Sequence, residues 1–442
     1  MTQADRLAEE LPAQRNLRIN TYSLIASNLL TGLLGLVFWG AAARLYPAEA
    51  VGVGAAVLNS AVMLSALSLL SIDALFERFL PSAGVRTGPL LTRGFLLVAC
   101  VALVAGIAAV MFGPDELFES GWMMVLYPLV VVGHALFTLE DKATAGLGVA
   151  RWAAAKNTVH AVAKLVALVA LAWTGAALSM VLAWATTGAV IVAVVLLAMR
   201  RRYRTDPQFL GPPTLPPVRQ ILRYSGSSIG ITAVSVIVPL ALPLIVLSQF
   251  GAVANAHFTV AWAMVGALYM TVHLIVSPYI AEVAAHPDKV RTLSLRMMGT
   301  MAVASAVGSI ALVTVGPFAL GLVGGEYRAE GEGLLYLAAL FIPLSAITAI
   351  YEGFARVNRK LGFILAVRGV AAVLIAVGSY IAVPIYGVIG VGWVHLVIEA
   401  VTAAIFLLPV LRHLKRNKQD PGWLARSVAR NDDDPTTVLP IA

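Results

Sequence analysis

The chain has 442 residues, of which 60% are hydrophobic and only 12% charged, and its mean hydropathy is +0.87. Soluble domains carry about a quarter charged residues, so this composition excludes a particle whose surface is coated by water. The formal net charge of +8 is spread between apolar runs. This spacing argues against nucleic acid as a partner.

The apolar runs decide between the two kinds of membrane-spanning structure. In lipid, only helices and closed barrels satisfy every backbone polar group. The runs here are continuous and about 20 residues long, whereas barrel strands are about 10 residues long and alternate in polarity. The sequence therefore predicts an all-α polytopic membrane protein with about 12 spans, at 21–43, 51–72, 91–113, 120–138, 154–173, 177–199, 225–247, 256–278, 297–319, 333–354, 362–383 and 387–410.

The distribution of basic residues predicts the orientation of these spans. Residues 1–20 are polar and contain no short apolar core followed by a cleavage site, so the first span is expected to act as an uncleaved insertion signal. When basic residues at the ends of spans are counted with the adjoining connection, all Lys and Arg residues except Arg44, Arg328 and Lys164 are assigned to segments on the N-terminal side of the membrane. The positive-inside rule then predicts that both termini are cytoplasmic, in the plasma (inner) membrane. The single cysteine, Cys100, excludes an intramolecular disulfide and a cysteine-based metal site.

The chain order also predicts a domain organisation. A segment with five prolines and a basic cluster, 200–222, follows the sixth span and resembles a semi-rigid linker. It separates an N-lobe (21–199) from a C-lobe (223–411), and the longest outer loop is expected around 320–332. A shift of 205 residues places the first two spans on the seventh and eighth, and the later spans of the two halves match with small insertions. This layout predicts a parallel repeat about an axis along the membrane normal. The polar tail 412–442 is expected to be disordered in the cytoplasm.

Lys164 is the strongest candidate for a functional residue. Charged side chains inside a membrane are rare and usually functional, and Lys164 lies near the middle of the fifth span. Asn157, His160 and Lys164 are spaced by three and four residues, so they share one helix face. We expect this face to line a substrate cavity. The alternative is that Lys164 snorkels to the membrane surface or pairs with a structural carboxylate.

Glu399, in the last span, is the second candidate well inside the membrane, and His395 precedes it by one helical turn. Tyr269 and His273 have the same four-residue spacing in the eighth span. These positions predict a gate or ion-coupling site formed by Glu399, His395 and His273. The alternative is that a protonated glutamate and the histidines connect neighbouring helices by hydrogen bonds.

Weaker candidates lie in the first two spans and at their ends. Two asparagines within the spans and an arginine at the outer end of the first span are candidates for contacts with substrate, namely Asn28, Asn59 and Arg44. Three charged residues at the inner end of the second span are candidates for an inner gate, with a simple interfacial ion pair as the alternative, namely Asp73, Glu77 and Arg78.

No enzyme motif accompanies these residues. The sequence contains neither an HExxH zinc motif, a nucleophile elbow nor a Walker A lysine motif. We therefore expect no catalytic residue, no metal and no cofactor. Without a nucleotide-binding motif, transport would be driven by an ion gradient, the membrane potential or the substrate gradient.

Four segments of the chain follow a recognisable pattern, namely 27–81, 146–157, 218–230 and 351–363. In the first segment, a span ending in Ala-Arg is followed by a short loop, a second span and an Arg-Phe-Leu-Pro stretch, with Arg44, Glu49, Gly52, Arg78 and Pro81 at the defining positions. In these segments and in the layout of its spans, the sequence resembles polysaccharide exporters of the O-antigen flippase type, which belong to a larger group with the multidrug-and-toxin extruders and the lipid II flippase.

The resemblance implies two lobes that alternate access and carry a polyprenyl-phosphate-linked saccharide from the inner to the outer leaflet. Lys164 and His160 would then meet its phosphate groups. The implied partners are this lipid-linked saccharide, membrane lipids and glycan polymerases or glycosyltransferases, with the transporter itself a monomer. The chain departs from drug extruders because its first and seventh spans lack acidic residues.

Two other functions remain open. An ion-coupled exporter of small molecules would use Glu399 with His395 for coupling. A non-transporting scaffold for the synthesis of envelope glycans would recruit enzymes through its basic tail, but it offers no reason for a charged Lys164 inside a span.

Overall fold

The computed structural model describes residues 30–118, 120–358 and 361–419. Every regular element in these ranges is a helix, and no strand occurs in them. Ten of these helices are long and apolar enough to cross a membrane, and one shorter apolar helix covers Leu30–Leu45. The all-helical, multi-pass architecture predicted from the sequence is confirmed. Candidate Asn28 lies outside the described residues.

Helix α8, Val218–Leu274, consists of two rods that meet at Gly251. The backbone of Gly251 has φ 79° and ψ −177°, a conformation that essentially only glycine adopts. If α8 is counted as two segments and Leu30–Leu45 is added, the described chain has twelve apolar segments, in agreement with the predicted number.

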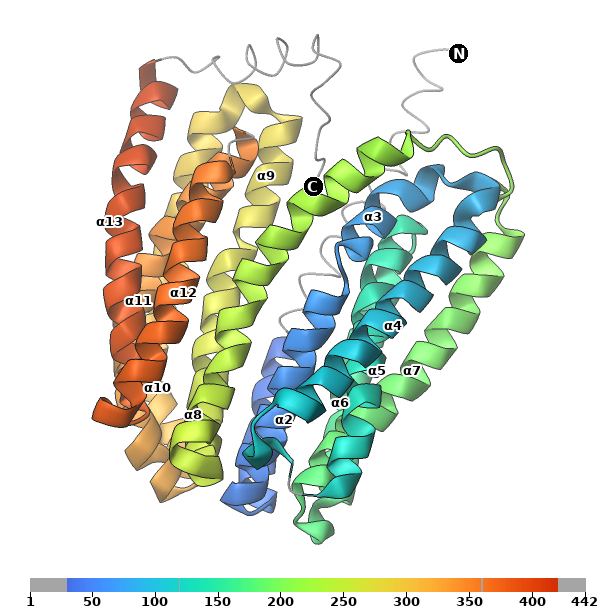
Figure 1. The fold of residues 1–442 in the computed structure, drawn as a ribbon. Coiled ribbons are helices and arrows are strands. Elements are labelled where there is room, and N and C mark those ends of the chain that lie inside the picture. Colours follow the sequence, from blue (N-terminus) through green and yellow to red (C-terminus); the bar gives the residue numbers. More distant parts are fainter. Residues whose placement is uncertain (1–29, 119, 359–360, 420–442) are drawn as a thin grey trace. The chain divides into compact units, whose positions relative to one another are not determined.

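The chain forms two compact units, Met1–Ala256 (unit 1) and His257–Ala442 (unit 2). Unit 1 therefore includes the first rod of α8, and the division into two six-helix lobes stays a prediction. Figure 1 shows the other labelled helices of unit 1 in blue to green, namely α2 (Ala48–Ser68), α3 (Ile72–Phe79), α4 (Thr87–Phe112), α5 (Gly121–Gly146), α6 (Arg151–Ala170) and α7 (Ala177–Thr205).

Helix α2 forms the centre of unit 1. Two thirds (67%) of its apolar window is buried, compared with 17% for the window containing α4. Small side chains dominate the α2 sequence AEAVGVGAAVLNSAVMLSALS and allow neighbouring helices to approach closely. Helix α4 is richer in exposed Leu and Val, as expected for a helix that faces hydrocarbon.

The predicted linker 200–222 is partly helical and packs against the rest of unit 1. Helix α7 continues to Thr205, and a short 3₁₀ helix follows at Pro207–Phe209. The amide of Val85 donates to the carbonyl of Gly211, and the amide of Thr214 donates to the carbonyl of Ser82, both at 2.9 Å. These bonds attach the proline-rich segment to the connection between α3 and α4.

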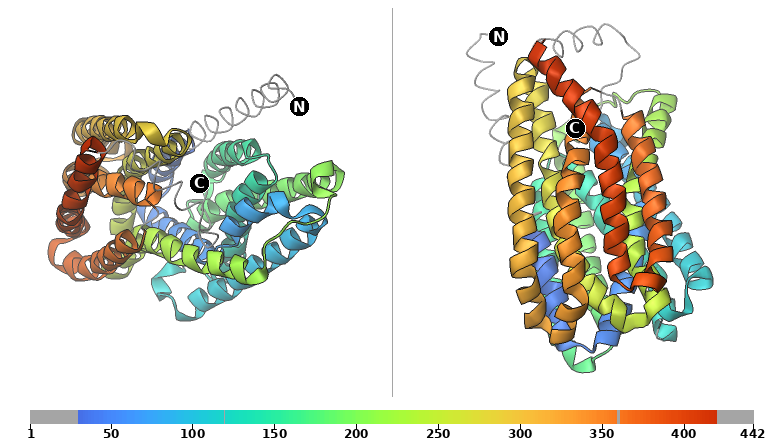
Figure 2. Two further views of the ribbon diagram at one scale, coloured as in Figure 1. Left: turned by 90° about the horizontal axis from the view of Figure 1, so that it is seen from above. Right: turned by 90° about the vertical axis from the view of Figure 1, so that its left-hand side faces the viewer.

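Unit 2 contains the rest of α8 and five further helices. Helix α11 is its most buried span, with 67% of its apolar window covered. It packs against both α10 and α13, and α13 also packs against α12 (Figures 1 and 2). The helices are α9 (Val276–Ala285), α10 (Val290–Val323), α11 (Gly325–Val357), α12 (Gly362–Tyr386) and α13 (Ile389–Gln419).

The outer loop predicted around 320–332 is wrong. Helix α10 ends at Val323 and α11 begins at Gly325, so Gly324 alone separates them. Glu326 lies in the first turn of α11, where the helix dipole favours negative charge. Arg328 pairs with Glu332 one turn later at 3.2 Å.

Candidate functional site

Lys164 lies on α6 and is half-buried. Its ammonium group is 5.1 Å from the ring centroid of Phe38 on the helix Leu30–Leu45, a favourable cation–π distance. No ion pair with Lys164 is formed among the described residues. Unit 1 therefore holds a positive charge within a span, next to an aromatic ring and without a direct carboxylate partner.

His160, one turn before Lys164, is buried in the interface of α5, α6 and α7. Its Nε2 lies 3.1 Å from the carbonyl oxygen of Trp184. The ring of His160 also contacts the rings of Phe137 (4.7 Å) and Trp184 (5.6 Å). Beside these rings is a mostly apolar cavity of about 180 Å³, also lined by His134.

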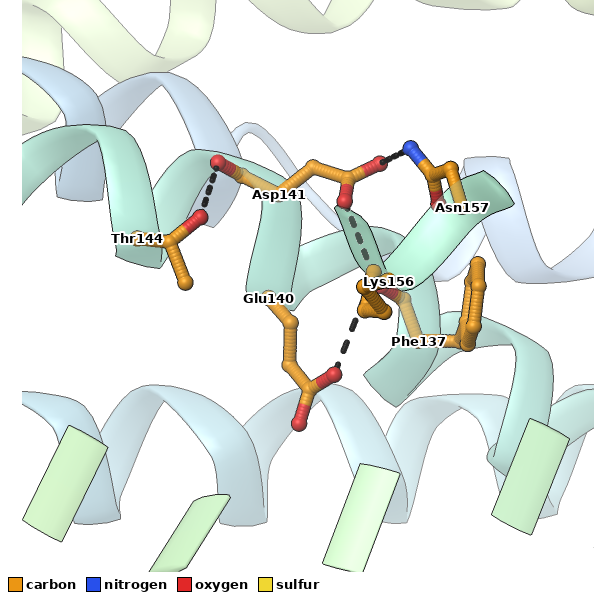
Figure 3. Close-up of polar contacts among 6 residues, drawn as sticks. All are labelled: Phe137, Glu140, Asp141, Thr144, Lys156 and Asn157. Atoms are coloured by element: carbon orange, nitrogen blue, oxygen red, sulfur yellow. Dashed lines mark hydrogen bonds and ion pairs between the residues drawn. The ribbon is translucent and has the colours of Figure 1, made fainter. Parts of the chain in front are cut away.

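Asn157 belongs to a group of charges between α5 and α6 that is shown in Figure 3. Its Nδ2 donates to Oδ2 of Asp141 at 3.3 Å, and Oδ1 of Asp141 lies 2.8 Å from the ammonium group of Lys156. Glu140 completes this group, with Oε2 3.7 Å from the same ammonium. We call Glu140, Asp141, Lys156 and Asn157 the α5–α6 charge cluster.

The charged core of this cluster is deeply buried. Glu140 is 0% exposed and Lys156 is 3% exposed. Lys156 also donates to the carbonyl of Phe137, and its ammonium lies 3.6 Å from the centroid of that ring. Neither carboxylate oxygen of Glu140 has a hydrogen-bond partner in the described part of the chain.

The sequence analysis missed Glu140 and Asp141 because it ended the fourth span at residue 138, and it counted Lys156, near the start of the fifth span, with the basic residues of the inner surface. Helix α5 continues to Gly146, so the acidic pair lies on a helix and not in a loop. One signal was present: Lys156, His160 and Lys164 recur at four-residue spacing, which places them near one helix face. The structure gives the predicted residues of this face, Asn157, His160 and Lys164, three different sets of neighbours.

The predicted inner-gate residues lie on α3. Glu77 pairs with Lys142 of α5 at 2.8 Å, and both side chains are exposed. Arg78 lies 5.6 Å from the centroid of the Phe79 ring. Burial raises the pKa of Asp73 above its ordinary value, although the charge of Lys142 acts in the opposite direction.

Two further candidates of unit 1 lie on its first two apolar helices. Asn59 donates to the carbonyl of Ala55 in its own helix at 2.8 Å. Arg44 is exposed in the last turn of the helix Leu30–Leu45.

Unit 2 brings together polar residues from α8, α12 and α13. Arg368 of α12 donates to the hydroxyl of Tyr269 at 3.3 Å. The Tyr269 ring stacks on His273 with a centroid distance of 4.2 Å. Glu399 is 7% exposed, and its charge acts on both Arg368 and Tyr269. We call Tyr269, His273, Arg368 and Glu399 the Arg368 cluster.

His395 has a different environment from the rest of its predicted group. It is 7% exposed, and its Nδ1 lies 3.0 Å from the carbonyl of Val391. Its ring contacts Trp262 at 5.0 Å and Phe341 at 5.3 Å. His395 thus packs among aromatic rings.

Arg368 was missed because it lies close to the start of its helix and was counted with the basic residues at the inner membrane surface. It is the seventh residue of α12. The signal was its position inside the predicted span 362–383, which should have made it a candidate like Lys164. Within the described residues, no three His, Cys, Asp or Glu side chains are grouped so that they could hold a metal ion.

No family model matches the sequence, and no curated protein matches it. Solved structures do share its fold. An inward-facing multidrug resistance MATE family transporter of the MOP superfamily aligns with a TM-score of 0.62 at 16% identity, covering 89% of this chain and 96% of the transporter. The lipid II flippase MurJ in an inward closed conformation aligns with a TM-score of 0.64 at 11% identity, covering 95% and 94%.

The MATE multidrug transporter DinF-BH, in complex with R6G, aligns with a TM-score of 0.65 at 14% identity, covering 91% of this chain and 96% of the transporter. The chain therefore has the fold of MATE transporters and MurJ along nearly its whole length.

Proposed function

We propose that the protein is a membrane transporter that moves a polyprenyl-phosphate-linked saccharide from the inner to the outer leaflet by alternating access. The observation that carries this proposal is Lys164, a half-buried cation in a span with an aromatic neighbour and no ion-pair partner among the described residues. A positive charge in low-dielectric surroundings attracts an anionic ligand strongly. The phosphate groups of a lipid-linked saccharide supply such a ligand.

Two further considerations support this substrate class. The fold is shared with a lipid II flippase as well as with drug transporters. In unit 1, the buried carboxylate of Glu140 and the partly exposed carboxylate of Asp141 lie beside Lys156, so they do not neutralise Lys164 by direct contact. A cationic drug would gain little from approaching Lys164.

The proposal includes a location and partners. The protein would lie in the plasma membrane with both termini in the cytoplasm and act as a monomer. Membrane lipids and the enzymes that make or polymerise the saccharide would be its partners. His160, Asn157, Asn59, Arg44 and Asn28 are kept as further candidates for contacts with the substrate.

The test is a flipping assay in proteoliposomes with a fluorescent short-chain prenyl-pyrophosphate saccharide. Lys164→Met keeps the length and apolar packing of the side chain but removes its charge, so we expect flipping to fall at least about tenfold, because a hydrogen bond to a charged group contributes about 1.5–3 kcal/mol. Lys164→Arg should retain part of the rate because it keeps the charge.

Arg93→Met is the matched control, because Arg93 is an exposed cation on α4. Its rate should equal that of the wild type. If Lys164→Met flips the saccharide at the wild-type rate, Lys164 is not part of the substrate site. If the wild-type protein does not flip the saccharide, the proposed function is wrong.

A second function, ion-coupled export of a small molecule, is favoured by one observation. Glu399 is buried within α13, and Thr402 donates to its carboxylate at 3.4 Å. A buried carboxylate of this kind can take up and release a coupling proton. If wild-type vesicles extrude a lipophilic cation without flipping the saccharide, and Glu399→Gln removes the pH dependence of extrusion, this second function replaces the first.

A further inference from the structure

The guanidinium group of Arg368 has more hydrogen-bond donors than its neighbours use. Guanidinium carries five N–H donors. Among the described residues, Arg368 donates one hydrogen bond, from Nη2 to the hydroxyl of Tyr269 at 3.3 Å. The side chain is half-buried, and no hydrogen bond from its other donors is formed among the described residues.

The acidic residues whose charges act on Arg368 do not use its remaining hydrogen-bond donors. The charges of Glu399 and Glu352 both act on Arg368, but neither forms an ion pair with it in the described part of the chain. Glu352 is engaged by Arg356, which donates to its Oε1 at 2.7 and 2.9 Å. Glu399 accepts from Thr402. Arg368 therefore has acids within electrostatic reach and, among the residues that the structure describes, no direct counter-ion.

Tyr269 is positioned to act on the same ligand as Arg368. Its ring stacks on His273, with 18° between the ring planes, and Nδ1 of His273 lies 2.9 Å from the backbone carbonyl of Tyr269. A hydroxyl both accepts and donates. While its oxygen accepts from Arg368, the Tyr269 hydrogen can be donated to an oxygen that Arg368 also contacts.

From this arrangement we infer that Arg368 and Tyr269 form an anion site in unit 2 that binds a phosphoryl group. The identity of the ligand rests on the proposed function, in which a lipid-linked phosphate is carried. Guanidinium suits this role because its planar donors can bind two phosphoryl oxygens at once.

The sequence offers a matched control at Arg93. Arg93 is the seventh residue of α4 and Arg368 is the seventh residue of α12, and a glycine follows each of them. Arg93 is exposed, whereas Arg368 is half-buried beside Tyr269. The two arginines thus share their chemistry and their distance from the helix start and differ in their surroundings.

The experiment measures the affinity of the purified full-length protein for inorganic pyrophosphate by calorimetry. Arg368→Gln should weaken binding at least about tenfold, and Arg368→Lys should weaken it less, because lysine keeps the charge but not the planar pair of donors. Tyr269→Phe should weaken binding about fivefold, the usual effect of losing one hydrogen bond. Glu399→Gln should strengthen binding, because the negative charge that acts on Arg368 also repels an anionic ligand.

Opposite effects at Arg368 and Glu399 distinguish a binding role from a structural one, since loss of structure would weaken binding in both variants. Arg93→Gln should bind as the wild type does. Unchanged affinity in Arg368→Gln, or an equal loss in Arg93→Gln, would overturn the inference. If Arg368→Gln does not fold, unchanged affinity in both Tyr269→Phe and Glu399→Gln would overturn it as well.

The same preparations separate this inference from the proposed function. If the wild type flips the lipid-linked saccharide while Arg368→Gln binds pyrophosphate normally, the anion site is wrong and the transport function stands. If the wild type binds pyrophosphate through Arg368 but flips nothing, the site stands and the transport function is wrong. A wild type that does not bind pyrophosphate overturns the site.

Discussion

Asn255 donates a hydrogen bond of 2.7 Å from Nδ2 to the carbonyl oxygen of Gly52, 203 residues earlier in the chain. Asn255 is fully buried. At Gly52, a Cβ atom would lie 1.7 Å from the carbonyl oxygen of Ala252. Helix α2 and the start of the second rod of α8 therefore touch backbone to backbone, and only glycine leaves room for this contact.

Gly52→Ala should separate these two helices. The added methyl group meets backbone atoms, which cannot rotate away, so we expect a loss of about 1–3 kcal/mol, as for other overpacked sites. Thermal unfolding of the purified protein measures this loss. Gly35→Ala is the control, because a Cβ at Gly35 has no atom within 4 Å. Equal unfolding temperatures for the two variants would contradict the close contact.

The α5–α6 charge cluster should behave as one energetic unit. Lys156→Met leaves the carboxylates of Glu140 and Asp141 without their buried cation, and such a loss costs about 3–5 kcal/mol. Adding Glu140→Gln to Lys156→Met should restore part of the stability, because one buried charge is removed. A double-mutant cycle followed by thermal unfolding checks this coupling, and additive effects of the two changes would refute it.

Asp73 should make stability depend on pH. Burial raises its pKa above the ordinary value of about 3.9, so the native state binds this proton more tightly than the unfolded state. The stability that it contributes is therefore present at low pH and is lost as pH rises through the native pKa. Asp73→Asn cannot lose a proton, so its unfolding temperature should rise relative to the wild type as pH increases. A difference that stays constant from pH 4 to pH 7 would contradict the assignment.

The orientation of the spans can be tested at two connections. Reporter domains inserted after Gly211, in the connection that packs near α3, should be cytoplasmic because basic residues surround this segment. Reporters inserted after Gly324, between α10 and α11, should be external. An external signal at Gly211 would reverse the topology.

Composition and hydropathy were sufficient to predict the fold class. An apolar run of about 20 residues must form a helix in lipid, whatever its neighbours are, because its backbone groups have no other partners. The number of apolar segments and the break within α8 follow from this local constraint. Helix ends were less certain: α5 continues beyond the predicted residue 138 to Gly146 because its polar last turns still form helical hydrogen bonds.

The neighbours of each polar residue were decided by tertiary packing alone. Arg93 and Arg368 occupy the same position in their helices and are both followed by glycine, yet only Arg368 meets a tyrosine, 99 residues away in the chain. Likewise, the spacing of Asn157 and Lys164 predicted a shared face but not that one would contact Asp141 and the other Phe38. Hydropathy is a property of each segment by itself, whereas these contacts depend on which helices pack together and how each is rotated about its axis.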